Sequence, residues 1–481
     1  MRKRIFLVVI AIALLACVLG ALVACESYKS SSVIKGGEKD AVVESNGGLV
    51  VKQGGYLYFV NGYSGYLTSQ GKDNWFGNVV KGAIVRVTYN ADDTLGNDYT
   101  VIVPKSVMAS SENVGFSIFG EWIYYVSPSA EEDRTGTVQT DTLQFLRTKI
   151  DGTGTQLIMN WNNTSVKYKY TANALVYFDS ADSKLYSKDL TKKKFKKKDK
   201  GDCIAEDVAS VHFIKNENYD PAVKETPVAD YVLYTKNSDV SYEYGNTLYA
   251  TDPRGKDTKT LIGPDSYKDG KYNVSVIASS ADGDKLAIYY TKTHYVGTSS
   301  SGTVDGTYAY RFSDKTFTFQ EANEVTLSST ELSSLFPLSY AEGVVKTGSN
   351  AVIYHTDGTD PKSYGSLSLD TLLAVQNGAF YYLNSDNVLF YYPLDDKSNA
   401  HYAYSTGEKM MTSFTGVEYF RGYFYFILDD DYDYMARVKL ADIDVYSGKD
   451  AAIERVSLFS AADQAAYDKA QEEETEEKKE D

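Results

Sequence analysis

The chain has 481 residues, and its 65 acidic side chains outnumber its 49 Lys and Arg side chains, giving a formal net charge of −16. Such an acidic surface repels nucleic acid and anionic lipid, which excludes both as general partners. The three cysteines, Cys17, Cys25 and Cys203, are too few for a disulfide-stapled scaffold. The fold must therefore rest on a large hydrophobic core.

The first 24 residues have the organisation of an export signal. A basic tripeptide at residues 2–4 precedes an uninterrupted apolar run over residues 5–24. A signal peptide engages the translocation machinery through this combination. The run ends in Leu-Val-Ala before Cys25 and then becomes polar, which resembles the lipobox of bacterial lipoproteins. We therefore predict a lipoprotein signal peptide over residues 1–24 and lipidation of Cys25 with palmitate-type acyl chains.

Two alternatives to this signal stay open. Leu14-Leu15-Ala16-Cys17 fits the same pattern, but cleavage there would leave the apolar Val18–Ala24 as the mature N-terminus, so Cys25 is preferred. An apolar run of about 20 residues can also span a bilayer as an uncleaved anchor. Each alternative predicts that the rest of the chain lies in the cell envelope, on the extracytoplasmic face of the cell membrane.

The two ends of the mature chain differ in composition from its middle. Residues 25–46 are rich in Ser, Lys, Glu and Gly without apolar periodicity, which predicts a flexible tether. Residues 461–481 contain helix-forming Ala, Gln, Glu and Lys and end in an acidic run. We predict a short helix there that fades into a disordered acidic tail.

Residues 47–460 predict a single all-β domain. The chain contains 42 Tyr and 20 Phe but only 9 Pro, and aromatic residues favour half-buried strands. A short aromatic and aliphatic strand bounded by polar turns recurs at 55–61, 120–126, 174–178, 230–234, 285–290, 351–354, 378–383 and 422–427. Such a repeat predicts a β-propeller of seven or eight blades, since one blade cannot bury its own faces. The last copies are closely spaced, so one of them could be a second strand within a blade.

Two stretches carry a family resemblance. Trp122–Val126 followed by Leu146–Gly154 resembles the blade of the DUF5050 propellers, which are related to the low-density-lipoprotein-receptor blades. Ser280–Ile288 resembles the turn of TolB-type propeller blades, with Ala281 where proline is usual. These motifs are structural, so the resemblance implies a propeller fold and no particular activity. An assembly role comparable to that of TolB would rest on the second stretch alone.

No pattern predicts a cofactor or a clear metal centre. The histidines, which are His212, His294, His355 and His401, lie in different repeats. Asp429, Asp431 and Asp433 alternate and could offer oxygens to calcium, but Tyr434 and Leu440 stand where an EF-hand loop needs Gly and Glu. A solvated hairpin turn is the competing interpretation of these aspartates.

Catalytic motifs are equally scarce. Cys203 is a lone cysteine, which we expect to be a small buried hydrophobe rather than a nucleophile. Gly62–Gly65 lacks the spacing of the nucleophile elbow of hydrolases. Propeller glycosidases use paired carboxylates near the axis, and spacing along the chain cannot reveal such a pair.

The strongest local charge feature is a lysine run: Lys192, Lys193, Lys194, Lys196, Lys197 and Lys198. These lysines could bind an anionic wall polymer, such as teichoic acid, or the headgroups of the anchoring membrane. In the competing interpretation they occupy an exposed hairpin and prevent edge pairing between sheets.

Together these features predict a membrane-anchored extracytoplasmic lipoprotein. Its propeller would be a binding or scaffold module for an envelope protein or glycan, because loops on a rigid scaffold commonly carry recognition. A propeller-type glycan hydrolase or lyase is the alternative, for which the sequence offers no motif.

Overall fold

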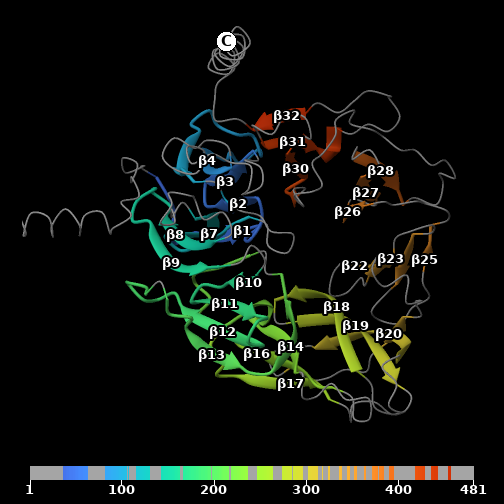
Figure 1. Ribbon diagram of the computed structural model, residues 1–481. Coiled ribbons are helices and arrows are strands. Elements are labelled where there is room, and N and C mark those ends of the chain that lie inside the picture. The colour runs from blue at the N-terminus through green and yellow to red at the C-terminus, as the bar shows by residue number, and fades with distance from the viewer. Residues whose placement is uncertain are drawn as a thin grey trace, which may run out of the picture.

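Figure 1 shows a computed structural model of the chain, in which successive β-sheets follow one another around a ring. The structure describes residues 36–62, 82–105, 107, 115–129, 142–162, 166–196, 198–215, 218–236, 246–263, 273–283, 285–295, 302–312, 317, 323–325, 335–337, 344–346, 351–354, 362–364, 371–376, 379–383, 389–394, 418–427, 435–442 and 453–456. Within these ranges the helical segments are two 3₁₀ turns, η3 (Val228–Asp230) and η6 (Leu440–Asp442), so the predicted all-β class is confirmed. No helix of these ranges has the length and hydropathy needed to cross a membrane.

The first half of the described chain forms four antiparallel sheets. The first sheet contains β1 (Val43–Glu44), β2 (Val50–Gln53), β3 (Tyr56–Asn61), β4 (Ala83–Thr88) and β5 (Thr100–Val103). The second contains β6 (Ser117–Phe119), β7 (Trp122–Pro128), β8 (Leu143–Lys149) and β9 (Gln156–Trp161). The third contains β10 (Lys167–Tyr170), β11 (Ala174–Asp179), β12 (Lys184–Asp189) and β13 (Asp202–Ala205). The fourth contains β14 (Val208–Phe213), β15 (Val232–Lys236), β16 (Leu248–Thr251) and β17 (Thr258–Ile262).

The second half continues the same pattern. The fifth sheet contains β18 (Asn273–Asp282), β19 (Lys285–Tyr295), β20 (Gly302–Phe312) and β21 (Asn323–Val325). The sixth contains β22 (Leu335–Pro337), β23 (Val344–Lys346), β24 (Val352–Tyr354) and β25 (Lys362–Ser363). The seventh contains β26 (Thr371–Gln376), β27 (Ala379–Leu383) and β28 (Leu389–Pro393). The eighth contains β29 (Glu418–Phe420), β30 (Tyr423–Ile427), β31 (Met435–Lys439) and β32 (Ile453–Val456).

The eight aromatic repeats of the sequence fall in eight different sheets. They correspond to β3, β7, β11, β15, β19, β24, β27 and β30, and each of these strands has a hydrogen-bonded neighbour on both sides. Strands in such interior positions are buried on both faces, which explains their nearly continuous apolar sequence. The suggestion that one late copy is a second strand within a blade is therefore wrong.

Hydrophobic clusters join several pairs of neighbouring sheets. Val126 and Phe145 of the second sheet pack in one cluster with Tyr168 of the third, and the Phe145 and Tyr168 rings meet edge to face at 4.9 Å between centroids. Further clusters link the third sheet to the fourth, the fourth to the fifth, the sixth to the seventh and the seventh to the eighth. This stacking gives the described chain its propeller-like architecture.

The last sheet closes the ring against the first. Phe420, Tyr425 and Met435 belong to the same core cluster as residues of β2 to β4, and β31 lies beside β3 (Figure 1). The first sheet is built entirely from N-terminal strands and the last entirely from C-terminal strands. The described closure therefore depends on side-chain contacts between the two sheets.

Two further features refine the sequence predictions. The turn at Ser280–Ile288 is confirmed as the tight link from β18 to β19, where Asp282 pairs with Lys285 and Gly283 has a φ of 58°. Glycine adopts such a left-handed backbone at no steric cost. Val43 is fully buried in β1, so ordered structure begins before residue 47, where we placed the start of the domain.

Candidate functional site

The described residues line an open cavity of about 2050 Å³ on one face of the ring. Its walls are the β6–β7, β10–β11 and β18–β19 turns, the β12–β13 and β14–β15 connections and the β16–β17 turn. In an antiparallel four-stranded sheet, the first and third connections emerge at the same end. The cavity is therefore lined by the connections at the same end of four consecutive sheets, the second to the fifth.

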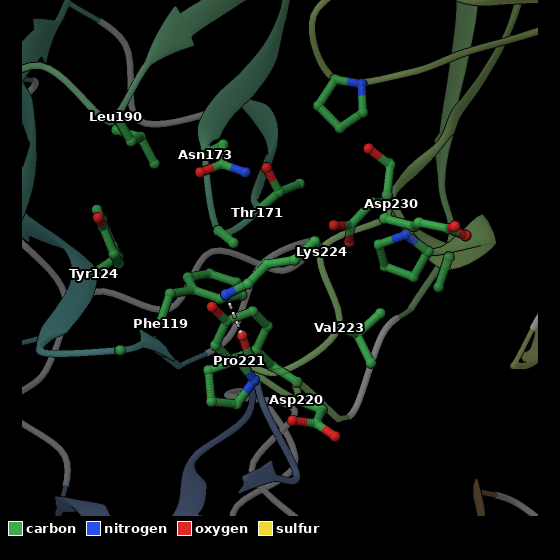
Figure 2. A pocket seen from close by; sticks show the side chains of 18 of the residues that line it. Phe119, Tyr124, Thr171, Asn173, Leu190, Asp220, Pro221, Val223, Lys224 and Asp230 are labelled. Carbon is green, nitrogen blue, oxygen red and sulfur yellow. Dashed lines mark hydrogen bonds between the residues drawn. The ribbon is translucent and has the colours of Figure 1, made fainter. Parts of the chain in front are cut away.

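The longest wall is the crossing loop (residues 214–231), which connects β14 to β15 and is described except at residues 216–217. Tyr219 exchanges two backbone hydrogen bonds with Val43 of β1, with N···O distances of 2.8 and 2.9 Å. The Tyr219 ring also meets Phe119 edge to face, with centroids 5.1 Å apart. The loop thus leaves the fourth sheet and reaches the first. Its residues Asp220, Pro221 and Val223 are among those that line the cavity (Figure 2).

Lys169 of β10 binds both ends of the crossing loop. Its buried ammonium donates hydrogen bonds to the carbonyl oxygens of Ile214, at 2.7 Å, and of Ala229, and lies 3.5 Å from a carboxylate oxygen of Asp230. Burial lowers the pKa of Lys169 and the Asp230 carboxylate opposes that effect. Because a buried cation must be compensated by acceptors, this arrangement ties the ends of the loop to the third sheet.

The lysine run lies in the lysine loop (residues 190–200), which connects β12 to β13 and is described except at Lys197. Arg147 of β8 holds its start, because the guanidinium donates to Leu190 O at 2.7 Å and to Lys192 O at 2.9 Å. The same group also stacks on the rings of Trp122 and Phe195, at 4.1 and 4.7 Å from their centroids. Arg147 is only 4% exposed, so these contacts are desolvated and strong.

Lys188 of β12 holds the other end of the lysine loop. Its ammonium, on a side chain that is 2% exposed, donates to Lys196 O at 3.3 Å and to Asp199 O. Burial lowers the pKa of Lys188 from its ordinary value. Two buried cations therefore bind main-chain carbonyls of the loop, while the loop's own described lysines, which are Lys192, Lys193, Lys194, Lys196, Lys198 and Lys200, are exposed. The lysine run therefore lies in an exposed connection between two strands.

The structure divides these lysines into two groups. Lys192 and Lys193 line the cavity, whereas Lys194, Lys196 and Lys198 do not. Seven basic and five acidic side chains line the cavity in all, although acidic residues are in excess over the whole chain. The basic ones are Arg147, Lys192, Lys193, Lys215, Lys224, Arg254 and Lys256, and the acidic ones are Glu121, Asp220, Glu225, Asp230 and Asp252. The cavity thus has a charge balance opposite to that of the protein.

The expectation that Cys203 is a buried hydrophobe is wrong. Cys203 is a free, exposed thiol in β13, an edge strand of the third sheet, and its Sγ lies 3.4 Å from Ala205 O. Partial burial and the Glu206 carboxylate raise the pKa of the thiol. Since the thiolate is the nucleophilic form, this environment does not activate Cys203.

His212 of β14 makes a contact between sheets. Its Nε2 lies 2.8 Å from Ser279 Oγ of β18, and burial, with the positive charges of Lys167 and Lys169, lowers its pKa to about 4. The imidazole is therefore neutral in the folded protein at neutral pH. Within the described ranges, no group of three His, Cys, Asp or Glu side chains could hold a metal ion.

Several residues predicted from the sequence lie outside the described ranges. They are Cys25, His355, His401, Lys197 and the aspartates Asp429, Asp431 and Asp433, and His294 is described only by its backbone in β19. The calcium and lipidation predictions therefore stay predictions.

The crossing loop is the part of the site that sequence reasoning missed. A signal for it was present, because the interval between the strands that end at Phe213 and begin at Val232 is long and contains Pro221 and Pro227. Connections of this length inside a compact domain are commonly functional.

No protein-family profile and no curated protein matches the chain. Among solved structures it is similar to apo AztD from Citrobacter koseri, with 9% identity, a TM-score of 0.36 and coverage of 79% of this chain and 93% of that one. It is also similar to the Dos1 propeller, with 8% identity, a TM-score of 0.32 and coverage of 74% and 84%. At such values neither similarity bears on ligand or activity, and the description of the fold rests on the sheets themselves.

Proposed function

We propose that this protein is a membrane-anchored extracytoplasmic lipoprotein with an eight-bladed propeller, which binds an envelope glycan or protein in the cavity. The observation that carries the proposal is the way the cavity walls are fixed. Three cations bind carbonyl oxygens of the two loops that form these walls: Arg147 and Lys188, which are buried, and Lys169, which is 12% exposed. Loops held in one conformation lose less entropy when a ligand binds, which favours recognition.

Exposed apolar groups at the cavity also support binding. Val42 and Val223, which are 46% and 56% exposed, are the exposed large hydrophobic residues of the described chain, and both line the cavity. Exposed apolar side chains beside charged ones are typical of interaction sites.

The path of the N-terminal segment supports an orientation toward the membrane. Glu38 accepts a hydrogen bond from Gly55 N at 3.3 Å, and Lys39 O lies close to Gly120 in the β6–β7 turn. Val42 then lines the cavity. The chain therefore enters the ring on the face that carries the cavity. A lipid on Cys25 would hold this face toward the membrane on a short tether.

A bulky substitution in the cavity tests the binding function. Asn173 is exposed in the β10–β11 turn, and its carbonyl accepts hydrogen bonds from Leu190 N and Arg254, which a substitution preserves. We expect Asn173→Trp to weaken binding to the recognised member of a panel of envelope glycans, wall polymers and surface proteins by about tenfold or more, because the ring fills the cavity. Binding is measured on the protein expressed from the full-length sequence.

Ala181→Trp is the matched control, since Ala181 is exposed in the turn at the opposite end of β11. Equal effects of the two substitutions would contradict a site in the cavity. The same panel is assayed for product formation, and turnover of a glycan would favour the hydrolase or lyase alternative.

The anchor is tested independently by Cys25→Ser. We expect this substitution to move the protein from the membrane fraction to the soluble extracytoplasmic fraction, because lipidation requires the thiol and acyl chains contribute roughly 0.8 kcal/mol per buried CH₂. Cys17→Ser is the control and should leave the distribution unchanged. Retention of the Cys25→Ser protein in the membrane would instead support the uncleaved anchor.

A further inference from the structure

A basic rim made of Lys192, Lys193 and Lys256 borders the cavity. Lys192 and Lys193 begin the lysine loop, and Lys256 lies in the β16–β17 turn of the next sheet. Arg254 joins these segments, because its Nη2 lies 2.9 Å from Asp189 Oδ1 and donates to Asn173 O at 3.1 Å. The three lysines thus belong to one connected surface.

The charges of the basic rim are not neutralised within the described chain. None of its three ammonium groups lies within ion-pair distance of a described carboxylate, and all three side chains are exposed. Asp199, an acidic residue of the lysine loop, accepts a hydrogen bond from Gly201 N at 2.9 Å, and this bond and the positive charge of Lys192 lower its pKa.

Three of the five acidic groups that line the cavity have partners other than the ammonium groups of the basic rim. Glu121 pairs with Lys149 at 3.0 Å and Asp230 with Lys169 at 3.5 Å. Asp252 Oδ1 accepts the backbone N–H groups of Lys256 and Asp257, at 2.5 and 2.8 Å. These carboxylates therefore stabilise the walls, and the basic rim remains available to a ligand.

The side-chain type of the available cations, arginine or lysine, indicates which class of anion the cavity can bind. Arginine recognises a single carboxylate or phosphate through its fixed pair of donors, but Arg147 and Arg254 already bind protein acceptors. The available groups are lysines, which act as separate point charges on flexible stems. They do not converge on one buried point, and the volume of about 2050 Å³ far exceeds that of one small oxyanion. The arrangement suits a chain of repeated negative charges.

We infer that the cavity binds a linear phosphodiester polymer of the envelope, with successive phosphates contacting the basic rim. The inference rests on the proposed binding function and specifies its ligand class. The polymer replaces the hydration of the lysines without requiring a fixed donor geometry. Binding of this kind releases counterions from the polymer and therefore weakens steeply as the salt concentration rises.

The test compares two double variants that remove the same charge from the same loop. Lys192→Gln with Lys193→Gln alters the basic rim, and Lys194→Gln with Lys196→Gln alters exposed lysines outside the cavity. The probe is poly(glycerol phosphate), and binding to the protein expressed from the full-length sequence is measured over a range of salt concentrations. We expect the first pair to weaken binding about tenfold at low salt and to reduce the slope of log K against log salt by about 1 to 2. The second pair should change binding less than about twofold.

Four outcomes would overturn the inference. Equal losses for both pairs would show diffuse attraction, and binding confined to phosphatidylglycerol vesicles would show that lipid headgroups are the partner. Binding of a neutral glycan or a protein, sensitive to Asn173→Trp but not to the basic rim, would reject the polymer while preserving the proposed function. Competition by inorganic phosphate only at high millimolar concentration would support a polymer, whereas micromolar competition would contradict it.

Discussion

Replacement of Glu418 by alanine is expected to lower the free energy of unfolding by about 2–4 kcal/mol, because this carboxylate joins the last sheet to the first. Glu418 begins β29, and its Oε2 accepts the N–H groups of Leu49 and Val50, at 2.6 and 3.1 Å. Its Oε1 accepts the Ser45 hydroxyl. Without the carboxylate, these donors from the first sheet lose their acceptor at the point where the ring closes.

Chemical denaturation of the variant measures this loss. Glu206→Ala is the control, because Glu206 makes an ion pair with Lys184 whose partners are 70% and 34% exposed. Such an exposed pair should contribute less than about 1 kcal/mol. Equal stabilities of the two variants would mean that Glu418 does not hold the ring closed.

The pH dependence of stability provides a second readout for Glu418. Burial raises the pKa of this carboxyl, against the effects of Lys215 and of the hydrogen bonds from Ser45, Val50 and Leu49. An acid whose pKa is higher in the folded state takes up its proton there first, so the part of the stability that is linked to this protonation is complete below the unfolded value and is lost as pH rises through the folded value. Glu418→Gln, which cannot titrate, should remove this part of the pH dependence.

Replacement of Arg147 by alanine is expected both to release the lysine loop and to lower the free energy of unfolding. The substitution removes a desolvated cation that binds Leu190 O, Lys192 O and Gln156 Oε1. We expect a loss of about 3–4 kcal/mol, because buried acceptors lose charged donors and the contacts with Trp122 and Phe195 disappear. Released from this contact, the loop should be cut by trypsin about tenfold faster or more.

Lys149→Ala is the matched control for Arg147. Lys149 follows two residues later in β8 and also approaches the Trp122 ring, at 5.4 Å from its centroid, but it makes a partly exposed ion pair with Glu121. Its loss should cost less than about 1 kcal/mol and leave the trypsin sites protected. Arg147→Lys should resemble Arg147→Ala in trypsin sensitivity, since one ammonium cannot reproduce the forked geometry. Unchanged cleavage in both Arg147 variants would refute the anchoring role.

The positions of the interior strands could be predicted from the sequence, because a strand that is buried on both faces has a nearly continuous apolar sequence. Segments such as 120–126 and 422–427 carry an uninterrupted aromatic and aliphatic pattern, and both form interior strands, β7 and β30. By contrast, β1 is only two residues long and was assigned to the tether, because so short a strand has no periodicity.

The roles of the residues at the site could not be predicted from the sequence in the same way. Lysines 192–198 were evident as a charge run, but their division between the cavity and the outer surface depends on how the loop folds back over β8. In the sequence, Arg147, Lys169 and Lys188 look like ordinary polar strand positions, although Arg147 and Lys188 are buried and Lys169 is only 12% exposed. Arg147 and Lys169 bind carbonyl groups that are 40 or more residues away in the sequence. Such contacts cannot be predicted from the spacing of residues along the chain.

The sequence by itself thus determined the all-β class, the repeat and the interior strands, because hydrophobic periodicity is a local consequence of burial. Tertiary structure alone decided that the crossing loop reaches from the fourth sheet to β1, that Glu418 joins the eighth sheet to the first, and that Lys192, Lys193 and Lys256 border one cavity. These arrangements unite residues of different sheets, and their energies come from contacts that exist only once the ring has closed.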